Sequence, residues 1–321
     1  MLRHLARRVA GTVVLLVLVV IVTFTLVHLA PGDTAQALAG QGGGDPQHLA
    51  TLRHGLGLDK PLVEQIGVYL GAVLQGNLGF SVIQAQPVLH VILQRLPATL
   101  LLFGSSLVLA TVGGVVLGVV AAARRRTRTD AAISVASLTV SSLPLFWVGQ
   151  VLVGLLAIRL GWLPTGGLRS AGAPLDGFAA VLDVIAHLIL PAGVLSLLML
   201  GLIVRITRSS MIEVLAEDYV RAARARGIPE RRLLFRHALP NALRPVVTVV
   251  TAELGLVLTG TVLVENVFAW PGLGSLLLDS VLNRDNLTLV GLLLFSALLV
   301  ATGNLVADVV HLAIDPRVRC R

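Results

Sequence analysis

The sequence predicts an all-α, polytopic membrane protein with six transmembrane helices. Of its 321 residues, 55% are hydrophobic and only 13% are charged, whereas an ordinary soluble domain is about 25% charged. The apolar residues gather in runs of about 20, the length that spans a bilayer. The basic residues gather between these runs, so the formal net charge of +8 is explained without a nucleic acid as partner.

The first predicted span is the apolar run from Val9 to Ala30, and residues 1–30 form an N-terminal transmembrane helix. Three arginines precede this run. A cleaved signal peptide is the alternative, with a cleavage-like site at Ala35-Gln36-Ala37. The apolar core of a signal peptide is about 7–15 residues long. The longer run here favours a retained helix.

Residues 31–96 contain no spanning run and are predicted to form a small extracytoplasmic domain between the first two helices. Glycines, a proline and scattered charges interrupt this region. Asp59-Lys60-Pro61 predicts a turn into a short helix from Leu62 to Leu74, and Gly76 to Ser81 predicts another turn.

Five further spans are predicted within residues 97–314. They are Pro97–Ala123, Ala131–Leu160 with a kink at Pro144, Leu188–Val204, Val246–Val267 and Thr288–Ile314. Gly161–His187 and Phe268–Leu287 are predicted to be loops on the outer side. In the second span, Gly114 and Gly118 form a small-xxx-small pair. The pair either lets a neighbouring helix approach closely or reflects the ordinary frequency of glycine in membrane helices.

The distribution of arginine and lysine predicts the orientation. With six spans, 19 of the 25 basic residues lie on the side that holds both termini, and six lie on the other side. The positive-inside rule then places both termini in the cytoplasm, including a tail of residues 315–321. This tail contains the single cysteine, Cys320, so an intramolecular disulfide is excluded.

The longest polar interval in the second half of the chain is Glu217 to Pro245. It contains seven arginines and three acidic residues. Gly227 is predicted to end one helix in the left-handed conformation, which costs glycine little. Pro229 suits the start of a second helix, with Glu230 near its positive end. We therefore expect helix, glycine turn and helix at the membrane surface.

No catalytic or metal-binding residue is predicted. A P-loop ends in Lys-Ser or Lys-Thr, and the single lysine, Lys60, precedes a proline. No two histidines have the helical spacing of a metal site. Two acidic residues lie deep in predicted spans, Glu253 in the fifth and Asp308 in the sixth. Such residues either line a pore or gate, or bond to a neighbouring helix. Glu265 and Asn266 are expected at the membrane interface.

The polar interval resembles the cytoplasmic EAA loop in the membrane subunits of bacterial ABC importers. The two alanines and the closing Leu-Pro of that pattern correspond, counted from Gly227, to Ala222, Ala223, Leu239 and Pro240. Arg221 replaces a glutamate and His237 an isoleucine. Arginine at the former position is common in the dipeptide/oligopeptide/nickel branch. The stretches HLAPGD, LGLDKPL, GNLGFS, RLPATL, FAWPGLG and DPRVR also resemble that branch, in the same order.

This resemblance implies the type I ABC importer (MetI-like) permease fold in a bacterial plasma membrane. Residues 97–314 would form its five-helix transmembrane domain, with a coupling loop at 207–244. The implied partners are a second homologous permease, two ATP-binding subunits or domains that bind ATP and magnesium, an extracytoplasmic solute-binding protein and membrane lipid. Coupling to the ATPase is then assigned to Glu217, Arg221, Ala222, Ala223, Gly227, Leu239 and Pro240.

The resemblance also implies a substrate class. It predicts import of dipeptides or oligopeptides, with nickel, glutathione, an oligosaccharide or another small solute as alternatives. Residues 31–96 and 268–287 would face the solute-binding protein, and Gly227 would be a hinge of the coupling loop. Two other classes are a secondary carrier driven by ions, which would act without an ATPase, and a membrane scaffold that transports nothing.

Overall fold

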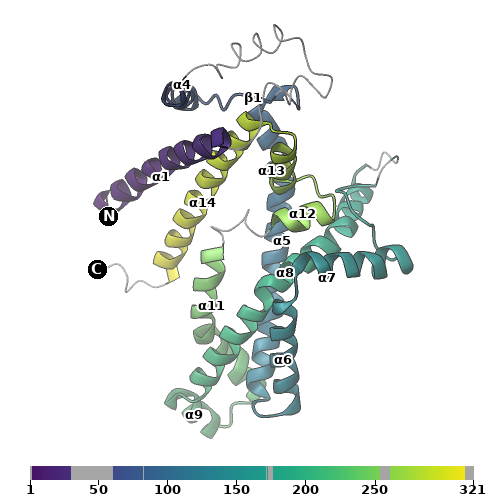
Figure 1. Ribbon diagram of the computed structural model, residues 1–321. Helices are drawn as coiled ribbons and strands as arrows, with labels where there is room; N and C mark the ends of the chain where they lie inside the picture. Colours follow the sequence, from purple (N-terminus) through teal and green to yellow (C-terminus); the bar gives the residue numbers. More distant parts are fainter. Residues whose placement is uncertain are drawn as a thin grey trace. The chain divides into compact units, whose positions relative to one another are not determined.

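The structure is a computed structural model, and its described part is mostly helical (Figure 1). It describes residues 2–29, 61–81, 83–170, 172, 176–253 and 261–314, without the side chains of residues 2–10, 27–28 and 308–314. The chain divides into two compact units, Met1–Pro97 with Gly272–Gly303 and Ala98–Pro271 with Asn304–Arg321.

The first unit contains helices from both ends of the chain and one small hairpin. Its elements are α1 (Leu2–Leu29), α4 (Leu62–Leu74), β1 (Phe80–Ser81), β2 (Gln86–Pro87), α13 (Leu273–Leu282), the start of α5 (Val88–Ala123) and most of α14 (Asn286–Ile314). β1 and β2 pair antiparallel. The short helix expected from Leu62 to Leu74 is confirmed, and it begins directly after Pro61. The Ser81 hydroxyl donates to the buried Asp285 carboxylate, which also accepts from the backbone of Thr288.

The second unit is arranged around one long helix, α8. Its elements are α6 (Arg128–Ser142), α7 (Leu145–Leu152), the π-helix η1 (Val153–Arg159), α8 (Phe178–Leu215), α9 (Asp218–Ala225), α10 (Glu230–Arg232), the π-helix η2 (Leu233–Ala238), α11 (Leu239–Glu253) and α12 (Thr261–Val267), together with α5 from Ala98 onward. α8 contacts α6, α7, α9, η2, α11 and α12. After α8 ends at Leu215, only two residues separate it from α9.

Three helices are long and apolar enough to cross a membrane in the described part of the chain. They are Val88–Ala123, Phe178–Leu215 and Asn286–Ala307. A fourth candidate is the pair Arg128–Ser142 and Leu145–Arg159, whose two arms are bent by 100°. Pro144 lies directly before the second arm. Proline lacks the backbone N–H that would continue the first helix, which explains why the two arms are separate. The expected kink is therefore a complete break, and the full set of six spans stays a prediction.

Several predicted boundaries were wrong. α5 begins at Val88, so Pro97 lies inside a helix instead of starting one. α8 begins at Phe178, within the loop expected to reach His187. Prolines are tolerated inside membrane helices because neighbouring groups satisfy the freed carbonyl, so they mark helix ends poorly here. α11 begins at Leu239 instead of Val246, and residues 254–260 of the predicted fifth span lie outside the described residues.

Glycines allow α5 and α8 to pack closely. A Cβ atom at Gly114 would lie 2.6 Å from Ile203 Cγ2, and one at Gly118 would lie 2.5 Å from Thr207 Cβ. Real side chains cannot approach so closely, so both positions require glycine in this packing. Of the two alternatives for this small-xxx-small pair, close helix approach is confirmed.

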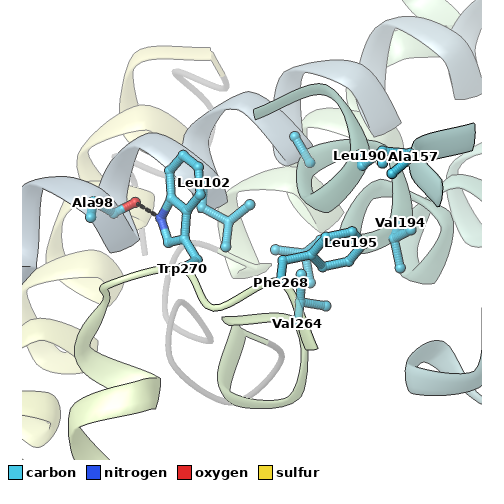
Figure 2. Close-up of a cluster of buried hydrophobic side chains, with 10 residues drawn as sticks. Ala98, Leu102, Ala157, Leu190, Val194, Leu195, Val264, Phe268 and Trp270 are labelled. Atoms are coloured by element: carbon cyan, nitrogen blue, oxygen red, sulfur yellow. Dashed lines mark hydrogen bonds between the residues drawn. The ribbon is translucent and has the colours of Figure 1, made fainter. Parts of the chain in front are cut away.

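The core of the second unit contains a buried aromatic group, which we call the Trp270 cluster: Ala98, Leu102, Leu195, Val264, Phe268 and Trp270 (Figure 2). Trp270 has no exposed surface, and its Nε1 donates to the carbonyl of Ala98 at 2.8 Å. The expectation that Phe268–Leu287 is simply an outer loop was wrong, because it begins in this core and then forms α13.

The interfacial position expected for Glu265 was also wrong. Its side chain is fully buried instead of interfacial, and Oε1 accepts a hydrogen bond from Thr99 Oγ1 at 2.9 Å. Together with the Trp270–Ala98 bond, this contact fixes the end of α12 to α5 just after Pro97. Asn266 is exposed, as an interfacial residue would be, and donates to the carbonyl of Val262.

Candidate functional site: a helix, glycine turn and helix after α8

The candidate site is the segment Glu217–Pro240, which we call the coupling segment. α8 ends at Leu215 and α9 begins at Asp218, so only two residues separate them. Glu217 precedes α9 and is exposed. Val220, in contrast, is fully buried, and α9 contacts both α8 and η2. α9 is therefore a short amphipathic helix that is held by the end of α8.

Gly227 ends α9 in the left-handed conformation, with a φ of +76°. Its N–H donates to the carbonyl of Arg224 at 3.0 Å, and the N–H of Ile228 donates to the carbonyl of Ala223 at 3.4 Å. These two bonds form a Schellman motif, the usual glycine ending of a helix. The predicted positive φ is confirmed, and Pro229 precedes the short helix α10 as expected.

An ion pair bridges the glycine turn. Arg224 donates from Nη2 to Glu230 Oε1 at 2.8 Å and from Nε to Oε2 at 3.2 Å. These hydrogen bonds raise the pKa of Arg224 above its ordinary value. The side chains are 49% and 56% exposed. The pair therefore fixes the angle between the two helices more than it stabilises the fold.

Beyond the turn, η2 and α11 anchor the segment to the ends of two long helices. The buried cluster there consists of Val119, Ala122, Met211, Ala238 and Ala242. Leu233 is also fully buried. The hydroxyl of Tyr219 on α9 accepts from Asn241 Nδ2 at 2.9 Å and donates to the carbonyl of His237 at 3.4 Å. A movement of α9 would therefore displace both α8 and α11.

The predicted coupling residues divide into exposed and packed positions. Ala222 and Pro240 are exposed, whereas Ala223 and Leu239 are half-buried. Arg221 is 68% exposed and lies 3.0 Å from Asp218. The outward surface also carries exposed arginines at 226, 231, 232 and 236.

Two aromatic residues of this surface were missed by the sequence reasoning. Phe235 is 54% exposed and Tyr219 is 44% exposed. Their position within a polar, arginine-rich interval was the signal that could have identified them, because exposed aromatic residues are enriched at binding sites.

The two candidate pore residues are only partly described. Glu253 is the last residue of α11 and is half-buried, and residues 254–260 after it lie outside the described part. Asp308 belongs to α14, but its side chain also lies outside the description. Their role in a pore or gate stays a prediction. Among the described residues, no group of three or more His, Cys, Asp or Glu side chains could hold a metal ion.

Comparison with known proteins covers almost the whole chain. Residues 114–320 match the family described as binding-protein-dependent transport system inner membrane component. Residues 1–103 match the N-terminal component of the same systems. The chain belongs to this family.

Individual members of this family are similar over the full length. The chain is 40% identical over 333 residues to the di/tripeptide transport system permease protein of Pseudomonas aeruginosa. It is 38% identical over 336 residues to the dipeptide transport system permease protein of Escherichia coli. It is 38% identical over 319 residues to the glutathione transport system permease protein of Salmonella choleraesuis. Each alignment covers 99% of both chains.

The match to this family confirms the predicted resemblance to membrane subunits of binding-protein-dependent importers, whereas the correspondence of the polar interval to an EAA loop stays a prediction. It also makes the chain a membrane component of a transport system, in agreement with its long apolar helices. The coupling segment lies within the matched residues 114–320, so it belongs to the part of the chain that the family shares.

Proposed function

We propose that this chain is the membrane-spanning permease subunit of an ATP-driven importer of peptides. It forms the translocation pore with a second homologous permease, and an extracytoplasmic solute-binding protein delivers the substrate. Two ATP-binding subunits or domains bind ATP and magnesium and hydrolyse the ATP. Family membership supports this assembly, because such transport systems depend on a binding protein.

In the proposed topology, six helices cross the plasma membrane and both termini are cytoplasmic. The coupling segment is then cytoplasmic, and residues 31–96 are extracytoplasmic. The distribution of basic residues supports this orientation, since 19 of 25 lie on the inner side. The three long apolar helices and the bent pair supply four of the six spans.

The proposal rests on one observation, the way in which the coupling segment is built. Its inner face is anchored by the fully buried Val220 and Leu233, each of which stabilises the packed position by about 1.5–3 kcal/mol. Its outer face carries arginines and Phe235. A segment with a buried, firmly packed inner face and a positively charged outer face suits docking onto an acidic groove of an ATPase.

The mechanism follows from the connections of the segment. When two ATPase subunits close on ATP, they displace the coupling segment that is docked on each of them. Because α9 is joined to α8 and hydrogen-bonded to η2 and α11, α8 and α11 move with it. The spans then change between inward-facing and outward-facing arrangements. The π-helix η2 lies within this connection, and π-helices occur frequently at functional sites.

Gly227→Val tests this function. Valine at a positive φ is strained by about 1–2 kcal/mol, so the Schellman turn would open and the angle between α9 and α10 would change. We expect peptide-stimulated ATP hydrolysis in the reconstituted complex to fall, with normal membrane insertion. Gly227→Asn should retain most of the stimulation, because asparagine tolerates this conformation.

Gly161→Val is the matched control. Gly161 also has a positive φ, +63°, and at both positions a Cβ atom would enter open space. The control therefore introduces the same backbone strain in a loop away from the coupling segment. Wild-type stimulation in Gly227→Val, or an equal loss in Gly161→Val, would contradict the coupling role.

Glutathione is the second candidate substrate. The relative from Salmonella choleraesuis carries it in its name and is as similar as the dipeptide permease of Escherichia coli. Glutathione is itself a small peptide, so one pore could suit both. Uptake of labelled dipeptides and of labelled glutathione by the complete complex, each with its binding protein, distinguishes the two.

A further inference from the structure

Asp130, in the first turn of α6, is a buried carboxylate bound by an arginine of α8. Its side chain is only 7% exposed. Arg208 donates from Nε to Oδ1 at 2.6 Å and from Nη2 to Oδ2 at 2.9 Å. A bidentate pair of this kind fixes the direction of both side chains as well as the distance between them.

The same carboxylate also holds the turn between α5 and α6. Asp130 Oδ2 accepts from the backbone N–H of Arg126 at 3.0 Å, and the N–H of Asp130 donates to Thr127 Oγ1. Arg126 has a φ of +65°, which is unfavourable for a residue with a side chain. Such a conformation persists only where the surroundings impose it. One side chain therefore connects the α5–α6 turn to α8.

The ion pair lies at one end of a close contact between α6 and α8. Two helical turns further along, Gly201 of α8 packs against Ser137 of α6, and a Cβ atom at Gly201 would lie 2.7 Å from the Ser137 carbonyl oxygen. Arg208 and Gly201 are seven residues apart on α8, as are Asp130 and Ser137 on α6, so both contacts lie on the same helix faces. The two helices are thus antiparallel and joined at two points.

This contact leads directly to the coupling segment. Arg208 lies on the part of α8 that runs to Leu215, and α9 begins at Asp218. We propose that Asp130 and Arg208 are positioning residues that make α6 move together with the coupling segment. This inference rests on the proposed function, because it assumes that an ATPase displaces that segment. The pair belongs to neither the docking surface nor the pore candidates.

The energetics favour transmission of movement over simple stabilisation. The pair is partly buried, since the Arg208 side chain is 33% exposed, and such a pair contributes little net stability because desolvation and solvent screening offset most of the attraction. What it does supply is one defined geometry between two helices. Without the pair, α8 still follows the ATPase through α9, but the start of α6 is no longer fixed to α8. ATP hydrolysis should then continue with less transport for each ATP.

Asp130→Asn tests this inference in the complete complex reconstituted into liposomes. Asparagine keeps the size of the side chain and an acceptor for Arg126, but it removes the charge that binds Arg208. We expect peptide uptake per ATP hydrolysed to fall about fivefold or more, while binding-protein-stimulated hydrolysis stays within about twofold of wild type. Arg208→Lys should give a smaller fall, because lysine keeps the charge and loses the bidentate contact.

Arg205→Gln is the matched control, since Arg205 lies one turn earlier on α8 and is exposed. Its uptake per ATP should equal that of wild type. An unchanged ratio in Asp130→Asn, or a parallel loss of uptake and hydrolysis, overturns the inference. If Asp130→Asn does not assemble, the ratio in Arg208→Lys decides in the same way. A wild-type complex without ATP-dependent peptide uptake overturns the proposed function, and with it this inference.

Discussion

The coupling segment and the Trp270 cluster lie in the same unit but are held together in opposite ways. In the coupling segment, the defining contacts join near neighbours in sequence, such as Arg224 with Glu230 six residues later, and they are half-exposed. In the Trp270 cluster, the bond from Trp270 to Ala98 spans 172 residues and is buried. The turn of the first region is formed by local sequence, although its inner face packs on the ends of α5 and α8. The second region is formed by the packing of distant helices.

This difference suggests different tasks. A locally determined segment keeps its shape while its outer surface exchanges water for a partner. A buried cluster of distant residues instead fixes which helices are neighbours, because breaking it exposes a large apolar area at once. Substitutions in the cluster should therefore affect stability strongly, and those in the coupling segment should affect mainly communication with partners. Three measurements test this contrast.

Trp270→Ala should have the largest effect. Removing a fully buried aromatic side chain costs about 3–5 kcal/mol of unfolding free energy, and the Ala98 carbonyl also loses its indole donor. We expect a marked fall in Tm of the purified protein in detergent. Trp162→Ala is the matched control, because Trp162 is 71% exposed. An equal, small effect of both substitutions would show that the Trp270 cluster does not stabilise this unit.

The same contrast explains what the sequence could and could not predict. The glycine turn at Gly227 and the start of α4 after Pro61 follow from local backbone rules, and both were predicted. At Pro144 the same rules predicted a kink, although the structure has a complete break. The buried position of Phe268 and Trp270, in the stretch FAWPGLG, could not be predicted. An exposed loop and a buried core segment differ here only in contacts with residues that are far away in sequence.

Buried polar residues were equally hard to predict. Glu265 at the end of a predicted span looks interfacial until its partner on α5, Thr99, is known. Asp130 beside four arginines looks like part of a basic turn until Arg208 is placed. Pro97 failed for another reason, since proline ends helices in water but is accommodated inside long membrane helices. Local signals therefore predicted the coupling segment better than the core.

Glu265→Ala should have an intermediate effect. It leaves the buried Thr99 hydroxyl without this acceptor and creates a small cavity, for a cost of about 1–3 kcal/mol. The measurement is again Tm in detergent, and Glu213→Ala at an exposed position of α8 is the control. If Glu265→Ala is as stable as the control, the carboxylate does not help to hold α12 against α5, and the cluster depends on its apolar contacts alone.

Breaking the Arg224–Glu230 pair should have the smallest effect on stability. An exposed ion pair contributes about 0.2–1 kcal/mol, and salt weakens it further. A double-mutant cycle with Arg224→Gln and Glu230→Gln should give a coupling energy in that range for unfolding of the purified protein. A value close to the cost of Trp270→Ala would mean that the coupling segment is not locally determined, and the contrast between the two regions would fail. Because Arg224→Gln should change the free energy of unfolding so little, a loss of ATPase stimulation in this variant would not be explained by unfolding. It would report a changed angle between α9 and α10 or a lost contact with the partner.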